Sequence, residues 1–278
     1  MLLPPNSCDT QIHVFGDLGS YPTRAGASYP PPEWATVDRM IAAQKAVGLN
    51  RAVLVQPSIY GSDHRLLLDC LSSLPRSDYV GVALLDGGVS DREIRTLHES
   101  GIRGVRFLLA ESLGLIPTPE ALLHVVNKVS EYGWVIKIYG LPNDWLTWRE
   151  TLSKIRSPAV FDHMASLDFS EGLDQQCLQM VEQFLRERDN WWINLGYGDA
   201  LSAGEYPWDD AVAFGQALYN VAPERCVWCS DWPRVMYPKS IPSDLQTLEL
   251  LFRYLPDREA IKAVLVDNPA RLFGFPRS

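Results

Sequence analysis

The chain has 278 residues, 46% of them hydrophobic and 21% charged, and a formal net charge of −9. This composition is typical of a globular protein with a substantial core. The negative charge argues against general nucleic-acid binding, which requires a basic surface to displace counterions from phosphates. No apolar run reaches the ~18 residues that span a bilayer. The first residues lack the basic and apolar regions of a signal peptide, so we expect a cytoplasmic protein.

Short apolar runs alternate with amphipathic segments along the chain, a pattern typical of parallel strands linked by helices. The expected strands are residues 8–14, 51–55, 79–84, 102–107, 134–139, 158–163, 191–195 and 225–230. The expected helices are residues 33–48, 63–74, 90–99, 118–132, 143–155, 172–188, 207–221, 243–254 and 258–267. A long loop is expected at residues 15–32. Eight strands in this order predict an α/β protein with a single closed barrel over residues 1–278.

Five cysteines are spread along the chain, and only Cys226 and Cys229 lie close together. Both fall in an apolar run that we expect to be a buried strand, on which they face opposite ways. An odd, dispersed set favours reduced thiols in the core over a redox pair.

Chemistry in such barrels gathers at the carboxyl ends of the strands. The first strand brings Gln11 and His13 there, and alternation puts both side chains on one face. Two histidines at this spacing would indicate a metal-binding pair. A glutamine amide is a far poorer ligand than imidazole for zinc-type ions, so this site has either lost a metal or never needed one.

Five other predicted strands also end in polar side chains. These residues are Ser58 and Tyr60 after the second strand, Arg106 on the fourth, Lys137 and Tyr139 on the fifth, His163 at the end of the sixth, and Asp231, Trp232 and Arg234 after the eighth. Each has a structural interpretation, because an aspartate before Trp-Pro commonly turns a loop and a strand-end histidine is commonly hydrogen-bonded. His13, His163 and Asp231 nevertheless end three separate strands, which predicts that they share one pocket.

The remaining titratable residues are less informative. Lys137 shares a face with Tyr139 that points into the barrel, where a buried lysine must form an ion pair or lose its proton. Imperfect alternation would instead turn it outward. His64, His98 and His124 fall in predicted helices, so we expect them to have structural roles.

Several segments resemble motifs of the amidohydrolase superfamily. They are Asp9-Thr10-Gln11-Ile12-His13, Phe161-Asp162-His163-Met164, Ser230-Asp231-Trp232-Pro233 and Asn268-Pro269-Ala270-Arg271-Leu272-Phe273. Two more segments resemble the branch that contains 2-pyrone-4,6-dicarboxylate lactonase. They are Val55-Gln56-Pro57-Ser58 and Gly101-Ile102-Arg103-Gly104-Val105-Arg106-Phe107.

The resemblance implies a distorted (β/α)8 TIM barrel that hydrolyses a small cyclic ester, in a branch where catalysis without a bound metal is known. By this resemblance Asp231 is the general base for the hydrolytic water, and His13 and His163 polarise the substrate carbonyl. Gln11 stands where the family has its first strand-one histidine, and its amide can donate a hydrogen bond. We therefore expect no metal and no other cofactor.

The substrate of the dicarboxylate lactonase is not expected to carry over. That enzyme holds its carboxylates with several arginines, of which this sequence keeps only Arg106, while Arg234 could anchor one anionic group. A dicarboxylate would leave negative charge poorly paired. We expect a less charged small molecule that could be aromatic, contacted by Arg106, Tyr139, Ser58, Tyr60, Trp232 and Arg234, with Trp145 nearby.

Three alternatives remain open at this point. The same Asp and His residues could support an isomerase, dehydratase or decarboxylase, because an aspartate base beside a polarised carbonyl also abstracts protons from carbon. A non-catalytic protein that binds a small molecule is a second alternative. Three ligands from His13, His163 and Asp231 could also still hold a metal. The sequence does not indicate the oligomeric state.

Overall fold

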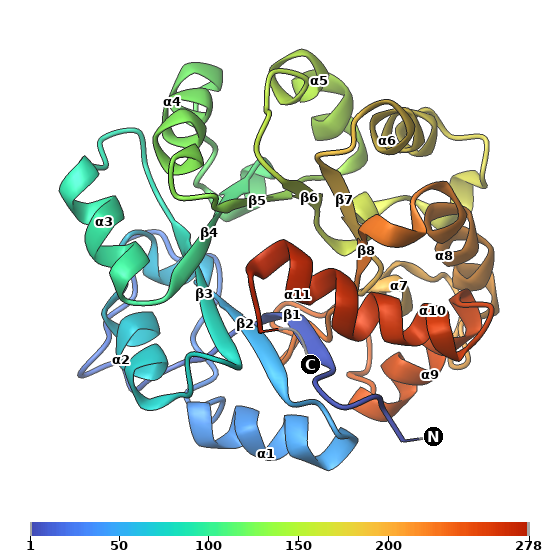
Figure 1. Cartoon of the computed structure of the whole chain (residues 1–278), viewed down its shortest axis with the longest axis horizontal. Helices are drawn as coiled ribbons and strands as arrows, with labels where there is room; N and C mark the ends of the chain where they lie inside the picture. Colours follow the sequence, from blue (N-terminus) through green and yellow to red (C-terminus); the bar gives the residue numbers. More distant parts are fainter. Residues whose placement is uncertain (1, 277–278) are drawn as a thin grey trace.

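Eight parallel strands form one sheet in the order β1 to β8, each paired with its sequence neighbours (Figure 1). The computed structural model describes residues 2–276. The strands are β1 (Cys8–Ile12), β2 (Arg51–Val55), β3 (Tyr79–Leu84), β4 (Ile102–Leu108), β5 (Val135–Tyr139), β6 (Ala159–Phe161), β7 (Trp191–Asn194) and β8 (Cys226–Val227). The ends of the sheet meet where the backbone N–H and Oγ1 of Thr10 donate to the Trp228 carbonyl, at 3.0 and 2.9 Å. The predicted (β/α)8 barrel is confirmed.

Helices surround the barrel and connect successive strands (Figure 1). They are α1 (Val37–Val47), α2 (Arg65–Ser73), α3 (Asp91–Glu99), α4 (Pro119–Ser130), α5 (Pro142–Leu152), α6 (Gln176–Glu187), α7 (Gly198–Leu201), α8 (Asp209–Val221), α9 (Asp244–Tyr254), α10 (Arg258–Lys262) and α11 (Asn268–Phe273). Local sequence sets their ends. Ser90 and Glu93 form a reciprocal capping box at the start of α3, and Gly48 ends α1 with a φ of 85° that glycine adopts without steric cost.

Alternation along the strands separates two apolar regions. On β5, Ile136 and Ile138 pack outward against the helices, whereas Val135 packs inside the barrel with valines from other strands. The C-terminal segment contributes Phe273 and Phe275 to this interior cluster. It closes the amino-terminal end of the barrel, because Asn268 donates to the carbonyl of Cys226, the first residue of β8, at 2.8 Å. The opposite end is left for a functional site.

Three strands end two or three residues earlier than the sequence predicted. β1 ends at Ile12, β6 at Phe161 and β8 at Val227, so His13, His163 and Asp231 lie just beyond their strands. Because each segment leaves the sheet early, its polar side chain lies over the end of the barrel. The predicted final helix is also divided, because a π-helical turn at Ala263–Asp267 joins α10 to α11.

Two other predictions, for the loop after β1 and for the cysteines, are confirmed. The loop after β1 contains no helix or strand over residues 15–32. All five cysteines are free and buried. Within residues 2–276, no helix has the length and apolar character needed to cross a membrane.

Candidate active site

A cavity of about 150 Å³ lies at the carboxyl end of the barrel. Six of the ten predicted site residues line it: His13, Ser58, Arg106, Tyr139, His163 and Asp231. Gln11 is fully buried beneath the cavity and touches two of these residues, His163 and Asp231. The structure therefore brings the proposed catalytic set together, as the strand-end pattern predicted.

The Asp231 carboxylate is held through one oxygen. Its Oδ1 lies 3.1 Å from Gln11 Nε2, 3.3 Å from His13 Nε2 and 3.6 Å from His163 Nε2. Its Oδ2 accepts no hydrogen bond from residues 2–276. Burial alone would raise the pKa of this carboxyl, but the two imidazoles and the amide hold the pKa well below its ordinary value. Asp231 is therefore ionised at neutral pH, with Oδ2 free to contact a ligand.

Asp9 fixes the backbone on both sides of this contact. Its buried carboxyl accepts hydrogen bonds from the backbone N–H of Gln11, at 3.1 Å, and of Ser230, at 3.1 and 3.2 Å. It thus ties the end of β1 to the residue before Asp231. Asp231 itself has a φ of 57°, a left-handed conformation that aspartate tolerates better than most residues. Burial raises the pKa of Asp9 to about 7, against the effect of these hydrogen bonds.

His163 begins an unusual left-handed turn. Residues 163–166 all have φ between 50° and 55°, and each non-glycine residue in this region costs about 1–2 kcal/mol. Trp145, buried on α5, donates its Nε1–H to the Ala165 carbonyl at 2.7 Å and so holds the turn. Trp145 is thus a support of the site rather than a cavity residue.

The contacts of His163 define its proton position. Its Nε2 lies 2.8 Å from Gln11 Nε2 and 3.4 Å from Arg106 Nη2, and both partners are N–H donors. Burial lowers the pKa of His163 to about 4, so the ring is neutral at neutral pH. The proton therefore lies on Nδ1, which is buried without a hydrogen-bond partner among the described residues. Nε2 is an acceptor in this arrangement.

A buried ion-pair triad underlies the cavity. Asp162 forms ion pairs with two cations: its Oδ2 lies 2.9 Å from Arg106 Nε and its Oδ1 lies 2.8 Å from Lys137 Nζ. Lys137 is fully buried. Burial would raise the pKa of Asp162, but the two cations keep it below its ordinary value. Lys137 points into the barrel, as alternation predicted. It does not line the cavity, whereas the Arg106 guanidinium does.

His13 is oriented from the side away from Asp231. Its Nδ1 lies 2.8 Å from the Val55 carbonyl, an acceptor that fixes the proton on this nitrogen. Its Nε2 faces Asp231 Oδ1. Donation to both oxygens at once requires a proton on each ring nitrogen.

The chain matches the amidohydrolase family model, Amidohydro_2, over residues 8–275. It belongs to the amidohydrolase family. It is similar to 4-sulfomuconolactone hydrolase of Rhizobium radiobacter, with 31% identity over 98% of this chain and 91% of the relative. It is also similar to 2-pyrone-4,6-dicarboxylate hydrolase of Comamonas testosteroni, with 28% identity over 98% of this chain and 91% of the relative. A solved apo structure from Agrobacterium tumefaciens has a TM-score of 0.89 at 25% identity, covering 100% of this chain and 98% of that one.

The predicted resemblance is thus confirmed, but three predicted substrate contacts of this amidohydrolase lie outside the cavity lining. Tyr60 packs on Phe15, and its hydroxyl accepts from the Gly16 backbone N–H at 3.3 Å. Trp232 packs edge-on against Trp34, with ring centroids 5.7 Å apart. These rings pack against neighbouring aromatic residues and do not line the cavity.

Arg234 is the third of these residues. Its Nη2 lies 2.7 Å from Asp244 Oδ1 on α9, and it also donates to Thr247 Oγ1 at 3.4 Å. The arginine is 5% exposed and does not line the cavity. The expected anchor for an anionic substrate is therefore already bound within the protein.

Sequence reasoning missed two tyrosines that line the cavity. Tyr29 comes from the long loop after β1, and Tyr197 follows β7. Burial raises the pKa of Tyr29 to about 12 and also raises the pKa of Tyr197, so both hydroxyls remain protonated donors. Tyr197 could have been found from its position after the seventh predicted strand. No pattern in the loop marks Tyr29.

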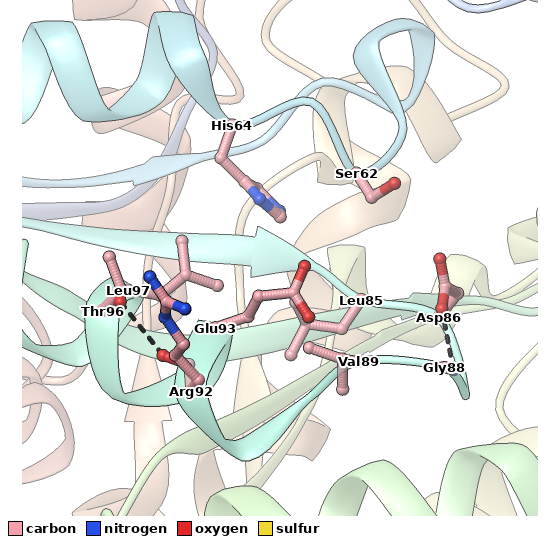
Figure 2. A pocket seen from close by; sticks show the side chains of 10 residues that line it. All are labelled: Ser62, His64, Leu85, Asp86, Gly88, Val89, Arg92, Glu93, Thr96 and Leu97. Carbon is pink, nitrogen blue, oxygen red and sulfur yellow. Dashed lines mark hydrogen bonds between the residues drawn. The ribbon is translucent and has the colours of Figure 1, made fainter.

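A second, larger hollow of about 380 Å³ lies beside His64 (Figure 2). His64 Nε2 donates to the Leu84 carbonyl at 2.9 Å, and the Glu93 carboxylate is used by the α3 capping box. His98, which does not line this hollow, also has a structural contact: it accepts a hydrogen bond from Trp134 Nε1 at 3.0 Å. The smaller cavity is the better active-site candidate, because an ionised aspartate, two imidazoles and a guanidinium converge there.

Proposed function

We propose that this amidohydrolase opens a small lactone by attack of a water molecule that Asp231 activates, without a catalytic metal. The observation that carries the proposal is the Asp231 carboxylate, whose Oδ1 accepts from Gln11 Nε2 and lies against His13 Nε2, while Oδ2 accepts no hydrogen bond from the described residues. The two curated relatives, both named as hydrolases of lactone substrates, support the reaction class.

In the proposed reaction, the water oxygen forms a bond to the lactone carbonyl carbon as Asp231 Oδ2 takes one water proton. The carbonyl oxygen becomes an oxyanion. The ring carbon–oxygen bond then breaks, and the leaving ring oxygen takes the proton back from Asp231. The product is the open-chain hydroxy acid or its tautomer, and the carboxylate is regenerated.

Arg106 and His13 are the proposed donors to the oxyanion. Arg106 lines the cavity, is permanently charged and is held by Asp162, so it needs little reorganisation during the reaction. His13 Nε2 lies against Asp231 and can donate to a nearby carbonyl oxygen when both ring nitrogens carry protons, because the Nδ1 proton faces the Val55 carbonyl. The role expected for His163 changes, because its Nε2 is an acceptor in this structure and has no proton to give to a carbonyl.

The low pKa of Asp231 has two consequences for the proposed base. It keeps the carboxylate ionised throughout the physiological pH range. It also makes Asp231 a weak base, since a group with a low pKa gains little by accepting a proton. A substrate carbonyl that draws the His13 N–H away from Asp231 would raise the basicity of the carboxylate at the moment it is needed.

The charges around the cavity favour a weakly charged substrate. Among the described residues that line it, Arg106 is the single lysine or arginine, and its charge is already shared with Asp162. Asp231 contributes a negative charge of its own. A dicarboxylate would add two more negative charges to this buried site, which is unfavourable without further cations. Tyr29, Tyr139 and Tyr197 could contact a planar ring instead.

A catalytic metal of the kind that a pair of strand-one histidines would bind does not fit these residues. Across residues 2–276, no group of three or more His, Cys, Asp or Glu side chains is arranged to hold a metal ion. Gln11 directs N–H donors at His163 Nε2 and Asp231 Oδ1, two atoms that a metal would need as ligands. The proposed reaction therefore has no step that depends on a metal.

The Asp231→Asn variant tests the proposal. Asparagine keeps an oxygen that can accept from Gln11 and His13 but removes the base, and loss of a general base typically lowers the rate by about 10²–10⁴-fold. Turnover of a panel of lactones with zero, one and two carboxylates would be compared in the two proteins. Wild-type rates in the variant would refute the assignment of Asp231.

Two controls accompany this experiment. Asp199→Asn removes another buried carboxylate, which accepts a hydrogen bond from the Tyr237 hydroxyl at 2.5 Å and does not line the cavity. This variant should leave turnover nearly unchanged. Reaction in heavy-oxygen water distinguishes hydrolysis, which places the label in the product acid, from isomerisation, which does not require it. A wild-type protein that turns over no lactone but is stabilised by lactones or small aromatic acids would favour a binding protein.

A further inference from the structure

The Gln11 side chain occupies the centre of the polar cluster. It is fully buried, and its Nε2 lies 2.8 Å from His163 Nε2 and 3.1 Å from Asp231 Oδ1. An amide nitrogen has two hydrogens, and these two acceptors use both of them. Gln11 Oε1 is buried without a hydrogen-bond partner among the described residues. The amide is therefore used entirely as a double donor.

The neighbours of the amide determine its orientation. Turning it by 180° would place Oε1 against the Asp231 carboxylate oxygen, and two acceptors would then face each other at the Asp231 contact. The carboxylate keeps the NH2 group inward. The partial positive charge of this group consequently lies between an anionic oxygen and an imidazole lone pair, a position that suits a cation.

The distances from Asp231 Oδ1 to the two imidazole Nε2 atoms match those between metal ligands. In a tetrahedral zinc site with bonds of 2.0–2.2 Å, the ligand atoms lie about 3.3–3.6 Å apart. Here Asp231 Oδ1 is 3.3 Å from His13 Nε2 and 3.6 Å from His163 Nε2. The Val55 carbonyl fixes the proton of His13 on Nδ1, the outer-shell arrangement common for a metal-bound imidazole.

We propose that the Gln11 amide replaces a divalent cation in this site, and that the single change Gln11→His opens a metal site formed with His13, His163 and Asp231. In both glutamine and histidine, Nε2 is three bonds from Cβ, so a histidine at position 11 reaches the same region. It supplies a lone pair where glutamine supplies hydrogens. The proposal rests on the proposed function only in taking this cluster as the active site.

The test compares zinc binding by wild-type protein, Gln11→His and Gln11→Met, each stripped with chelator, incubated with zinc and desalted. Methionine keeps the approximate size of glutamine but offers neither hydrogens nor an imidazole. We expect close to one zinc per chain in Gln11→His and far less in the other two proteins. Because losing one outer-shell partner already weakens metal binding 10–100-fold, gaining a direct ligand should tighten zinc binding by at least about 100-fold.

Two further measurements locate the zinc. Zinc should raise the melting temperature of Gln11→His in a concentration-dependent manner and leave that of the wild type nearly unchanged. Adding Asp231→Asn to Gln11→His should remove the bound zinc. Zinc retained by this double variant lies elsewhere and would overturn the proposal.

Other outcomes also decide the question. Stoichiometric zinc in the wild-type protein would contradict the replacement of a cation by Gln11, and so would a folded Gln11→His protein that binds none. Equal binding by Gln11→Met would show that position 11 need not supply a ligand. Each result is independent of turnover. A protein that hydrolyses no lactone but follows the zinc pattern contradicts only the proposed function.

Discussion

Replacing Asp9 with asparagine should change how the free energy of unfolding depends on pH. Asp9 is buried and ties the end of β1 to the residue before Asp231. Asparagine is nearly the same shape as a protonated aspartic acid, and its Oδ1 can still accept from the Gln11 and Ser230 backbone N–H groups. The variant therefore removes one titration and keeps most of the local structure.

The size and sign of the effect follow from the pKa of Asp9, which burial raises from 3.8 to about 7. Between these values the folded protein binds the proton and the unfolded chain does not, so the free energy of unfolding falls as pH rises. The full contribution is present below about pH 4 and lost above about pH 7. At 1.36 kcal/mol per pH unit, the loss amounts to about 4 kcal/mol.

His163 has the opposite effect over much of this range. Burial lowers its pKa from 6.5 to about 4, so the unfolded chain binds this proton and stability rises with pH by about 3 kcal/mol. In the wild type the two contributions nearly cancel between about pH 4 and 6.5. In Asp9→Asn the contribution of His163 remains, and stability should rise with pH there.

The assay is urea unfolding at half-unit pH steps, followed by tryptophan fluorescence for the wild type, Asp9→Asn and Asp189→Asn. Asp189 is exposed, so its variant controls for loss of one negative charge. The difference in unfolding free energy between wild type and Asp9→Asn isolates Asp9. A difference that stays constant across the range would show that Asp9 is ionised in the folded protein, and the reasoning would fail.

Two further substitutions test the surroundings of the site. Lys137→Met leaves Asp162 with one buried cation instead of two and should destabilise the protein by about 3–5 kcal/mol, measured by thermal unfolding; a loss below about 1 kcal/mol would contradict a buried ion pair. Arg234→Met removes the Asp244 ion pair and should cost about 2 kcal/mol while leaving KM unchanged. An increase in KM of tenfold or more would return Arg234 to the substrate-binding residues.

The barrel and the gathering of polar residues could be predicted because both depend on short-range rules. Apolar runs of strand length alternate with amphipathic segments, and parallel strands bring their carboxyl ends to one face. His13, Arg106 and Asp231 follow from those rules, although two of them lie beyond the strand ends. Alternation also placed Lys137 correctly inside the barrel.

The remaining site depends on loop conformation, which alternation does not encode. Tyr29 reaches the cavity from a loop without a sequence pattern, whereas Tyr60 and Trp232 turn away from it. The proton position on His163 could not be predicted either. It depends on two donors, Gln11 and Arg106, from strands distant in sequence.

The proposed reaction moves charge within the cavity without changing its total. As Asp231 Oδ2 takes the water proton, the negative charge passes from the carboxylate to the lactone oxygen. His13 lies against Asp231, and Arg106 lies beside His163, so the same donors can stabilise the charge before and after this transfer. A neutral lactone makes use of this arrangement fully. Each carboxylate on a substrate would add a negative charge that is present both before and after the proton transfer. The scarcity of cations around the cavity therefore limits the charge of the substrate.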